Sequence, residues 1–333
     1  MNIVCERLRY GARLDIVDPE LFQSRYRDAL VCVVGGGRGS AMSCQGVAQG
    51  MWLPLRGKLQ MATGDASFSL EPGQLFVGEP DQRIQASGRG AALWVALLGS
   101  KAAWRRTLSR VSGMLVPTPV LMPSWHEARP GLRRQALRIV RAALTQTREE
   151  PLLAASEDVI SALLELQSDF DTMIDRCPGR TLAQRHQVFL RLQRVRNHMA
   201  ASCHLDLGVP ELARMASYST WHFIRAFHEV YGETPYAYLV RQRLDRARRL
   251  VRASPLAISE IAQAIGFENR SAFSRLFKQR FGVSAADLRR QHGLSARRTL
   301  GRVTRREMDE LPLRATSASR AANSGQLAGL MDF

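Results

Sequence analysis

The stretch that decides the fold occurs twice, as Phe223-Ile224-Arg225-Ala226-Phe227 and as Phe273-Ser274-Arg275-Leu276-Phe277. The copies are 50 residues apart, and the match continues downstream to Tyr231-Gly232 and Phe281-Gly282. In each copy the two phenylalanines are four residues apart, which places them on one face of a helix. The repeat therefore predicts two amphipathic helices of the same design, each with an aromatic stripe buried in a core.

A shorter helix is expected before each of these two helices. Glu211-Leu212-Ala213 matches Glu260-Ile261-Ala262 at an offset of 49, so the second copy has one more residue in its turn. A short helix, a tight turn and a second helix, over 210–230 and 259–281, form the helix-turn-helix arrangement, whose second helix enters the major groove of B-DNA. An ordinary charged solvent face on a helical bundle is the alternative. Two ordered copies favour DNA binding.

A third helix is predicted between the two units, over 233–251. Thr234 is a good N-cap and Pro235 a good first residue, and apolar residues from Tyr236 to Val251 form a buried stripe. One rigid helix between two recognition helices predicts that a monomer reads two adjacent major-groove segments, about 34 Å apart. Arginines flank the stripe, and we expect some of them to face phosphates: Arg241, Arg243, Arg246, Arg248, Arg249 and Arg252.

The distribution of charge indicates the same partner. The 333 residues hold 47 Lys and Arg against 30 Asp and Glu, a net charge of +17. Residues 181–300 carry +12 of this excess, residues 1–180 carry +4 and residues 301–333 carry +1. A basic excess concentrated in one segment predicts a polyanion such as double-stranded DNA as the partner.

The N-terminal part has the pattern of a β-rich domain. Short apolar runs punctuated by Gly and Pro predict strands over 30–34, 50–55, 57–61, 66–70, 74–77 and 91–98, which favours an antiparallel sandwich or barrel. From about residue 101 the apolar period becomes helical, and two helices are predicted. Their stripe is buried either in its own domain or against a partner. It consists of Leu132, Ala136, Ile139, Leu163 and Leu166.

From about Arg185 to Arg290, the sequence resembles the DNA-binding domain of AraC/XylS-family transcription regulators. Besides the repeated segments, the resemblance rests on Gly232-Glu233-Thr234-Pro235-Tyr236 and Phe281-Gly282-Val283-Ser284. Two positions depart from the family pattern, with Ala285 where a proline is usual and Leu288 where an aromatic residue is usual. The resemblance implies base contacts from the exposed face of each second helix, here Trp221, Ile224, Arg225, Arg270, Ser271, Ala272 and Arg275.

The strands are similar to the cupin-type sensor domain of the same family, through Trp52-Leu53-Pro54-Leu55-Arg56-Gly57 and Leu70-Glu71-Pro72-Gly73. The chain is thus expected to be an α+β multidomain protein. A cupin-like β-barrel with dimerisation helices would occupy 1–180, and an all-α domain with two helix-turn-helix motifs would occupy 181–296. The segment 297–333 would be a disordered tail. The resemblance also favours burial of the helical stripe against a second copy, so a homodimer is expected.

A small organic effector, apolar or anionic, is the expected ligand of the barrel if there is one. No metal and no cofactor are expected, because His126 is the only histidine in residues 1–180 and lies outside the predicted strands. The cavity would be lined by Trp52, Phe68, Phe76 and Trp94, with Arg56 or Arg83 pairing with a carboxylate. The alternative is that these aromatic residues simply fill the barrel.

No catalytic site is predicted. The run Gly35-Gly36-Gly37-Arg38-Gly39-Ser40 lacks the Gly-Lys-Ser/Thr ending of a phosphate loop, and no nucleophile and base occur together, so we expect no enzyme. Five scattered cysteines are typical of reduced cytoplasmic thiols. No signal peptide is visible, and no apolar run approaches the roughly 20 residues that span a bilayer, so no membrane association is expected.

Together these features predict a cytoplasmic, sequence-specific, DNA-binding regulator of transcription. Activation through contact with RNA polymerase is the commoner mode in the family that the sequence resembles, and we expect it rather than repression. A non-specific architectural DNA binder is the alternative from another functional class. Equal affinity for unrelated duplexes would support that alternative.

Overall fold

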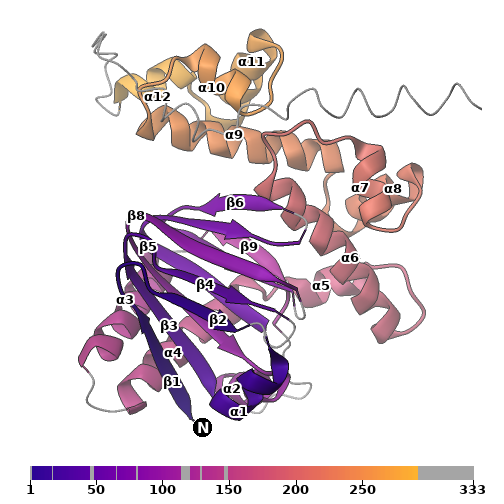
Figure 1. Cartoon of the computed structure of the whole chain (residues 1–333). Coiled ribbons are helices and arrows are strands. Elements are labelled where there is room, and N and C mark those ends of the chain that lie inside the picture. The colour runs from indigo at the N-terminus through magenta and orange to yellow at the C-terminus, as the bar shows by residue number, and fades with distance from the viewer. Residues whose placement is uncertain are drawn as a thin grey trace, which may run out of the picture. The chain divides into compact units, whose positions relative to one another are not determined.

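The computed structural model describes residues 2–16, 18–45, 49–64, 66–79, 82–113, 121–127, 130–145 and 149–291. The chain divides into two compact units (Figure 1). The sheet unit is drawn from Met1–Cys203 and Leu207–Leu239, and the C-terminal unit from His204–Asp206 and Val240–Phe333. The first repeated helix therefore belongs to the sheet unit and the second to the C-terminal unit. The tail predicted over 297–333 lies outside the described residues.

A single sheet contains the nine strands of the described residues, and its two longest strands organise it. Six strands follow the path β1-β3-β8-β5-β7-β9. Strand β3 pairs with the C-terminal half of β8 and β4 with its N-terminal half. Strand β2 pairs with β4, and β6 pairs with β5. The β1–β3 and β2–β4 pairs are parallel and the other pairs are antiparallel. The strands are β1 (Ile3–Leu8), β2 (Arg13–Ile16), β3 (Leu30–Gly37), β4 (Ala41–Cys44), β5 (Gln49–Ala62), β6 (Ser67–Leu70), β7 (Gln74–Val77), β8 (Ile84–Gly99) and β9 (Ser124–Glu127).

A bulge bends β5 near its middle. The register of β5 against β8 shifts between Pro54 and Lys58, and Gly57 there has φ +69°, a left-handed conformation that glycine adopts without a steric penalty. The sequence predicts two strands at this place, over 50–55 and 57–61. The structure shows one bent strand, which takes part in both halves of the sheet.

The sheet does not close into the cupin-like barrel that we expected. Among the described strands, no pairing joins β1 to β9 or β2 to β6, so the edges stay open. Apolar alternation predicts strands and their buried faces, but it carries no information on which edges meet. Closure is decided by pairing between distant segments, and this is why the sequence could not specify it.

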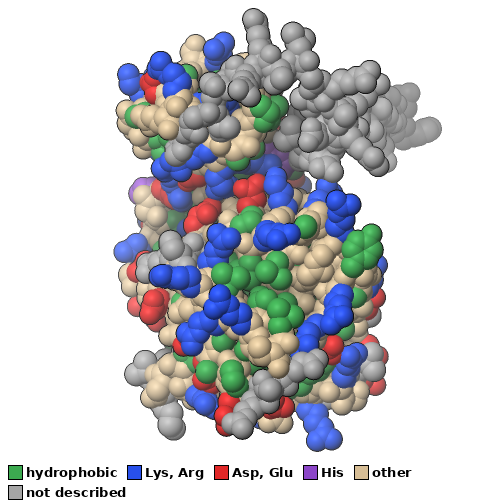
Figure 2. Space-filling view, turned by 90° about the vertical axis from the view of Figure 1, so that its left-hand side faces the viewer, with side chains coloured by type: hydrophobic (Ala, Val, Ile, Leu, Met, Phe, Trp, Pro, Cys, Tyr) green, Lys and Arg blue, Asp and Glu red, His purple; other side chains and the backbone are tan. Residues whose placement is uncertain are grey.

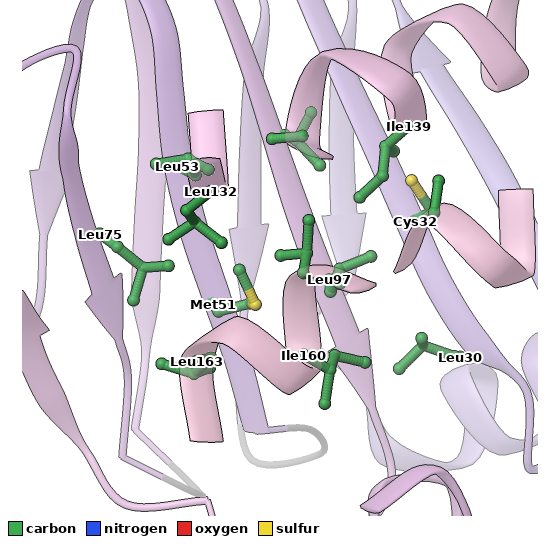
Figure 3. Close-up of a cluster of buried hydrophobic side chains, with 14 of the residues drawn as sticks. Leu30, Cys32, Met51, Leu53, Leu75, Leu97, Leu132, Ile139, Ile160 and Leu163 are labelled. Carbon is green, nitrogen blue, oxygen red and sulfur yellow. The ribbon is translucent and has the colours of Figure 1, made fainter. Parts of the chain in front are cut away.

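Two apolar clusters cover the two faces of the sheet. The inner cluster includes Trp52, Phe76 and Trp94. The outer cluster lies between the sheet and three helices, α2 (Lys101–Val111), α3 (Pro130–Thr145) and α4 (Glu149–Leu166), and Figure 3 shows helical and strand side chains meeting there.

The apolar stripe of α3 and α4 belongs to this outer cluster. Leu132, Ala136, Ile139 and Leu163 are at most 2% exposed, and Leu166 packs partly buried against them. Our expectation that this stripe forms a dimer interface is therefore wrong, because the sheet of the same chain already buries it.

The helix α6 (Leu182–Ala201) packs on the sheet within the same unit. It begins at a capping box in which the Thr181 hydroxyl accepts from the Gln184 backbone N–H and the Gln184 side chain accepts from the Thr181 N–H. It contacts β6 and β9, and the Arg194 guanidinium binds the Glu79 carboxylate at 2.6–3.0 Å. The other helices are α1 (Pro19–Tyr26), α5 (Phe170–Asp175), α7 (Val209–Met215), α8 (Thr220–Tyr231), α9 (Pro235–Ala253), α10 (Ile258–Ala264), α11 (Arg270–Phe281) and α12 (Ala285–Gln291).

Candidate nucleic-acid interface

Helices α7 and α8 form the first motif, and α10 and α11 form the second. In the first motif, Phe223 and Phe227 are fully buried with their ring centroids 5.7 Å apart. In the second, Phe273 and Phe277 are fully buried at 5.4 Å. The aromatic stripes predicted from the repeat are thus confirmed as core. They fix which face of each second helix remains in solvent.

The turns of the two motifs have the same backbone geometry. In the first, Ser217 has φ +58° and the Tyr218 N–H donates to the Ala213 carbonyl at 2.9 Å. In the second, Gly266 has φ +86° and the Phe267 N–H donates to the Ala262 carbonyl at 3.0 Å. Each turn therefore needs one left-handed residue. The second motif has glycine at that position, whereas the first has serine, which pays a steric cost there.

The exposed face of α8 combines apolar and basic side chains. Trp221 is 61% exposed and Ile224 is 37% exposed, although both are large apolar residues. The Arg225 guanidinium lies 5.6 Å from the Trp221 ring centroid, and its Nε donates to Glu229 at 2.9 Å. Arg225 is therefore oriented by a ring and a carboxylate, and because only its Nε donates to Glu229, the terminal Nη groups can still donate to DNA.

The exposed face of α11 is polar and basic. Arg270, Ser271 and Arg275 are exposed, whereas Ala272 is half-buried. Neither Arg270 nor Arg275 has an acidic partner among the described residues. The Asn269 side chain caps the helix, accepting from the backbone N–H of Ser271 at 2.8 Å and of Ala272 at 3.2 Å. Two guanidinium groups on this face thus remain available for an acceptor such as a guanine edge or a phosphate.

Two of the arginines of α9 that we expected near phosphates make contacts inside the C-terminal unit instead. Arg243 donates to the Leu205 carbonyl at 2.9 Å, and its guanidinium lies against Gly266. Arg246 lies 3.0 Å from His204 Nδ1. Burial, helped by the nearby Arg246 and Arg243 charges, lowers the pKa of His204 to about 4. The uncharged ring can therefore accept a hydrogen bond from the guanidinium at neutral pH.

Other arginines of the C-terminal unit are held by aromatic and acidic neighbours. Arg280 forms a two-pronged pair with Asp245 at 2.8–3.1 Å, and Arg248 and Arg280 lie 5.0 and 5.4 Å from the Phe281 ring centroid. Arg252 is exposed. The Arg280–Asp245 pair cannot be predicted from the sequence, because its partners are 35 residues apart and no local pattern links them.

Comparison with known proteins gives the relatives of this segment. Residues 212–291 match the family model described as a helix-turn-helix domain. The HTH-type transcriptional regulator GlxA of Rhizobium meliloti is 43% identical over 83 residues, which cover 25% of this chain and 25% of that protein. The transcriptional regulator Rob of Salmonella typhimurium is 35% identical over 95 residues, or 28% of this chain and 33% of that protein. This chain belongs to the AraC/XylS family.

A solved structure is similar to the same part of this AraC/XylS-family chain. The DNA-binding domain of AdpA in complex with a target DNA is 31% identical with a TM-score of 0.30, and the match covers 33% of this chain and 98% of that one. The chain spans between 25% and 38% of the length of the first curated relatives that it matches. The similarity to these relatives therefore concerns the helix-turn-helix segment.

The two departures from the AraC/XylS pattern lie in the core of the C-terminal unit. Ala285 and Leu288, both on α12, are 6% and 5% exposed and pack in the same cluster as Phe273 and Phe277. The terminal helix α12 thus forms with a smaller and a non-aromatic side chain at these positions.

The residues expected to line an effector cavity are only partly gathered by the fold. Trp52, Phe68, Phe76 and Trp94 are at most 6% exposed and share the inner cluster of the sheet. Phe76 lies 6.0 Å from Trp52 and 5.1 Å from Phe68, measured between ring centroids. The arginines expected to pair with a carboxylate, Arg56 and Arg83, lie on the surface, and Arg56 donates to the Ala91 carbonyl at 3.2 Å.

A small cavity borders part of this aromatic cluster. It lies between Phe68, Phe76 and α6 and has a volume of about 30 Å³, enough for about one water molecule. Within the described residues, no group of three or more His, Cys, Asp or Glu side chains is placed to hold a metal ion. In the same part of the chain, no helix has the length and apolar character to cross a membrane.

Basic side chains are not confined to the two motifs. Figure 2 shows Lys and Arg side chains over the whole of the face that it presents, with hydrophobic side chains between them. Helix α3 alone exposes Arg133, Arg134, Arg138 and Arg141. Positive charge by itself therefore does not locate a DNA interface on this chain, and the geometry of the two motifs has to do so.

Proposed function

We propose that this chain is a cytoplasmic regulator of transcription that binds DNA sequence-specifically through both motifs. The observation that carries the proposal is the paired design of α8 and α11. Each has one face fixed in a core by two phenylalanines, and the other face presents Arg225 on α8 and Arg270 and Arg275 on α11. An α-helix presented in this way fits the major groove, where arginine donates to O6 and N7 of guanine.

The two recognition helices differ in the chemistry that they present, and we assign their base contacts accordingly. Arg225, Arg270 and Arg275 are assigned to guanine edges or nearby phosphates, and Ser271 to either. Trp221, Ile224 and Ala272 present mainly apolar surface, and we assign them to thymine methyl groups. With α9 between them, the two motifs would read adjacent major-groove segments of one duplex.

Regulation would come from the remaining parts of the chain. We assign activation to contact between promoter-bound protein and RNA polymerase. Binding to paired DNA sites would need a homodimer, which we assign to the sheet unit. A dimer interface would have to use residues outside the buried stripe of α3 and α4. A small effector would bind the sheet unit, where it could influence α6 through the Arg194–Glu79 pair.

Selection of duplexes from a random library by the full-length protein tests the proposal. We expect a defined site with two blocks of preferred bases one helical turn apart, and a loss of affinity as salt rises because phosphate contacts release counterions. The matched control is Arg134→Ala, which removes one exposed charge from α3. Recovery of unrelated duplexes with equal affinity would instead indicate non-specific architectural binding.

A further inference from the structure

Two cysteines occupy paired positions on neighbouring strands of the sheet unit. Cys5 on β1 and Cys32 on β3 are direct partners in the parallel register of these strands. Adjacent strands are about 4.8 Å apart, and residues at paired positions project to the same face. The Cα atoms of a disulfide are usually about 4.4–6.8 Å apart. The backbone therefore holds these two residues at a separation that a disulfide requires.

The environments of the two thiols are different. Cys32 is fully buried in the outer cluster, where Figure 3 shows it near Ile139, whereas Cys5 is only half-buried at the margin of the same cluster. The groups that act on the ionisation of the Cys5 thiol are the Cys32 thiol and Arg7, which lies two residues further along the same strand. One sulfur is thus accessible to a small reagent, and the other is placed directly behind it.

The ionisation of the pair suits a reactive and a resolving cysteine. The Cys32 hydrogen bond and the Arg7 charge lower the pKa of Cys5 to about 7, against the opposing effect of burial. The pKa of Cys32 lies well above its ordinary value because of the Cys5 hydrogen bond and its burial. Near neutral pH, Cys5 is therefore thiolate in a substantial fraction of molecules, and the thiolate is the reactive form.

The other cysteines lack these properties. Cys44 and Cys177 are buried, and burial raises the pKa of each to about 12. Cys203 is 2% exposed. Thiols that are buried and protonated react slowly with oxidants. Cys5 therefore differs from the other four cysteines in accessibility, and from Cys44 and Cys177 in ionisation as well.

We propose that Cys5 and Cys32 form an oxidation site for small hydroperoxides and close to an intramolecular disulfide. The Cys5 thiolate attacks the terminal oxygen of the hydroperoxide, the O–O bond breaks, and the departing oxygen takes a proton and leaves as water or an alcohol. Cys5 is then a sulfenic acid. The Cys32 sulfur attacks the Cys5 sulfur, the S–O bond breaks, and the hydroxide leaves as water with the Cys32 proton. The two thiols lose two electrons, which reduce the peroxide.

The experiment treats fully reduced full-length protein with one molar equivalent of hydrogen peroxide at neutral pH, then alkylates it under denaturing conditions. Mass spectrometry of the digest should give one linked pair of peptides, containing Cys5 and Cys32, with Cys44, Cys177 and Cys203 alkylated. Linkage of other cysteines, linkage between two chains, or alkylation of all five cysteines would overturn the proposal.

Three variants separate the roles of the sulfurs. Cys5→Ser should slow peroxide consumption about tenfold or more, because the reactive thiolate is gone. Cys32→Ala should still consume peroxide but accumulate a Cys5 sulfenic acid that dimedone traps, since no resolving thiol remains. Cys44→Ser is the matched control and should behave as the unchanged protein does. Circular dichroism of each variant confirms folding, and equal consumption by Cys5→Ser and the unchanged protein would refute the assignment.

Discussion

Replacing Gly266 with alanine tests the account of the turn in the second motif. The residue has φ +86°, and a Cβ atom built on it would meet the Arg243 guanidinium at 2.9 Å. A left-handed conformation costs a residue with a Cβ about 1–2 kcal/mol. Displacing Arg243 from the Leu205 carbonyl costs about 1 kcal/mol more. Alanine also restricts the unfolded chain more than glycine does, which offsets about 0.5–1 kcal/mol of this cost. The expected net loss in free energy of unfolding is about 2 kcal/mol.

Hydrogen exchange of the full-length protein, resolved by peptide, measures this loss where it arises. Peptides from α10 and α11 should exchange about 30-fold faster in Gly266→Ala, as about 2 kcal/mol implies. Peptides from β5 should not change. At the equivalent position of the first motif, Ser217→Gly should slow exchange in α7 and α8 slightly, because it relieves strain at φ +58°. The expected gain in the free energy of opening is about 0.5 kcal/mol.

A double-mutant cycle separates backbone strain from the clash. In an Arg243→Ala background, Gly266→Ala should cost about 1 kcal/mol less, because no guanidinium remains for the Cβ to displace. Unchanged exchange in α10 and α11 on replacing Gly266 would show that the turn tolerates a Cβ atom, and the same cost with and without Arg243 would show that the Cβ atom does not displace the guanidinium.

Three other variants test the packing, the pH response and the recognition helix. Leu163→Asp should lower the free energy of unfolding by about 3–5 kcal/mol, because it buries a charge in the outer cluster. Thermal unfolding measures this loss, with Leu144→Asp at an exposed position of α3 as the control. A folded monomer with an unchanged melting temperature would contradict it. Burial and the nearby Arg196 lower the pKa of His126 to about 4. The unfolded chain therefore binds the proton of this histidine more tightly, and the free energy of unfolding falls by up to about 3 kcal/mol as pH falls from about 6.5 to 4. His126→Gln should flatten that part of the plot of stability against pH, and an unchanged slope would argue against it. Glu229→Gln should tighten DNA binding about threefold in titrations, because it removes the ion pair with Arg225 and a negative charge beside the phosphates. Weaker binding would show that Glu229 positions Arg225 for its contact.

The helical part of the fold could be predicted from the sequence because its signals are local. Phe223 and Phe227, and Phe273 and Phe277, specify which side of each helix is buried, and the structure places all four in cores. Thr234 and Pro235 predict the start of α9, which begins at Pro235. Such patterns depend on residues within a turn or two of each other, so their physical meaning does not change with the rest of the chain.

The parts that the sequence could not predict depend on contacts between distant segments. The strands β1, β2, β4 and β9 have weak or short apolar patterns, and each pairs with a strand that is distant in the sequence. No local pattern that we used separates Arg243 from the other arginines of α9, yet its contacts are with Leu205 and Gly266. Likewise, the stripe of α3 and α4 predicts burial but not the identity of the covering surface, which the fold supplies from the sheet.

Base reading by both recognition helices can be measured by titrating Arg225→Ala and Arg275→Ala proteins against the selected site and its single-base variants. Each substitution should weaken binding to the selected site by about 1–3 kcal/mol and remove the preference at one position in its own half-site, leaving the other half-site unchanged. Arg134→Ala should leave both half-site preferences unchanged. An equal loss of affinity on the selected site and on unrelated duplexes would contradict base reading, because it would make both arginines phosphate contacts that carry no sequence information.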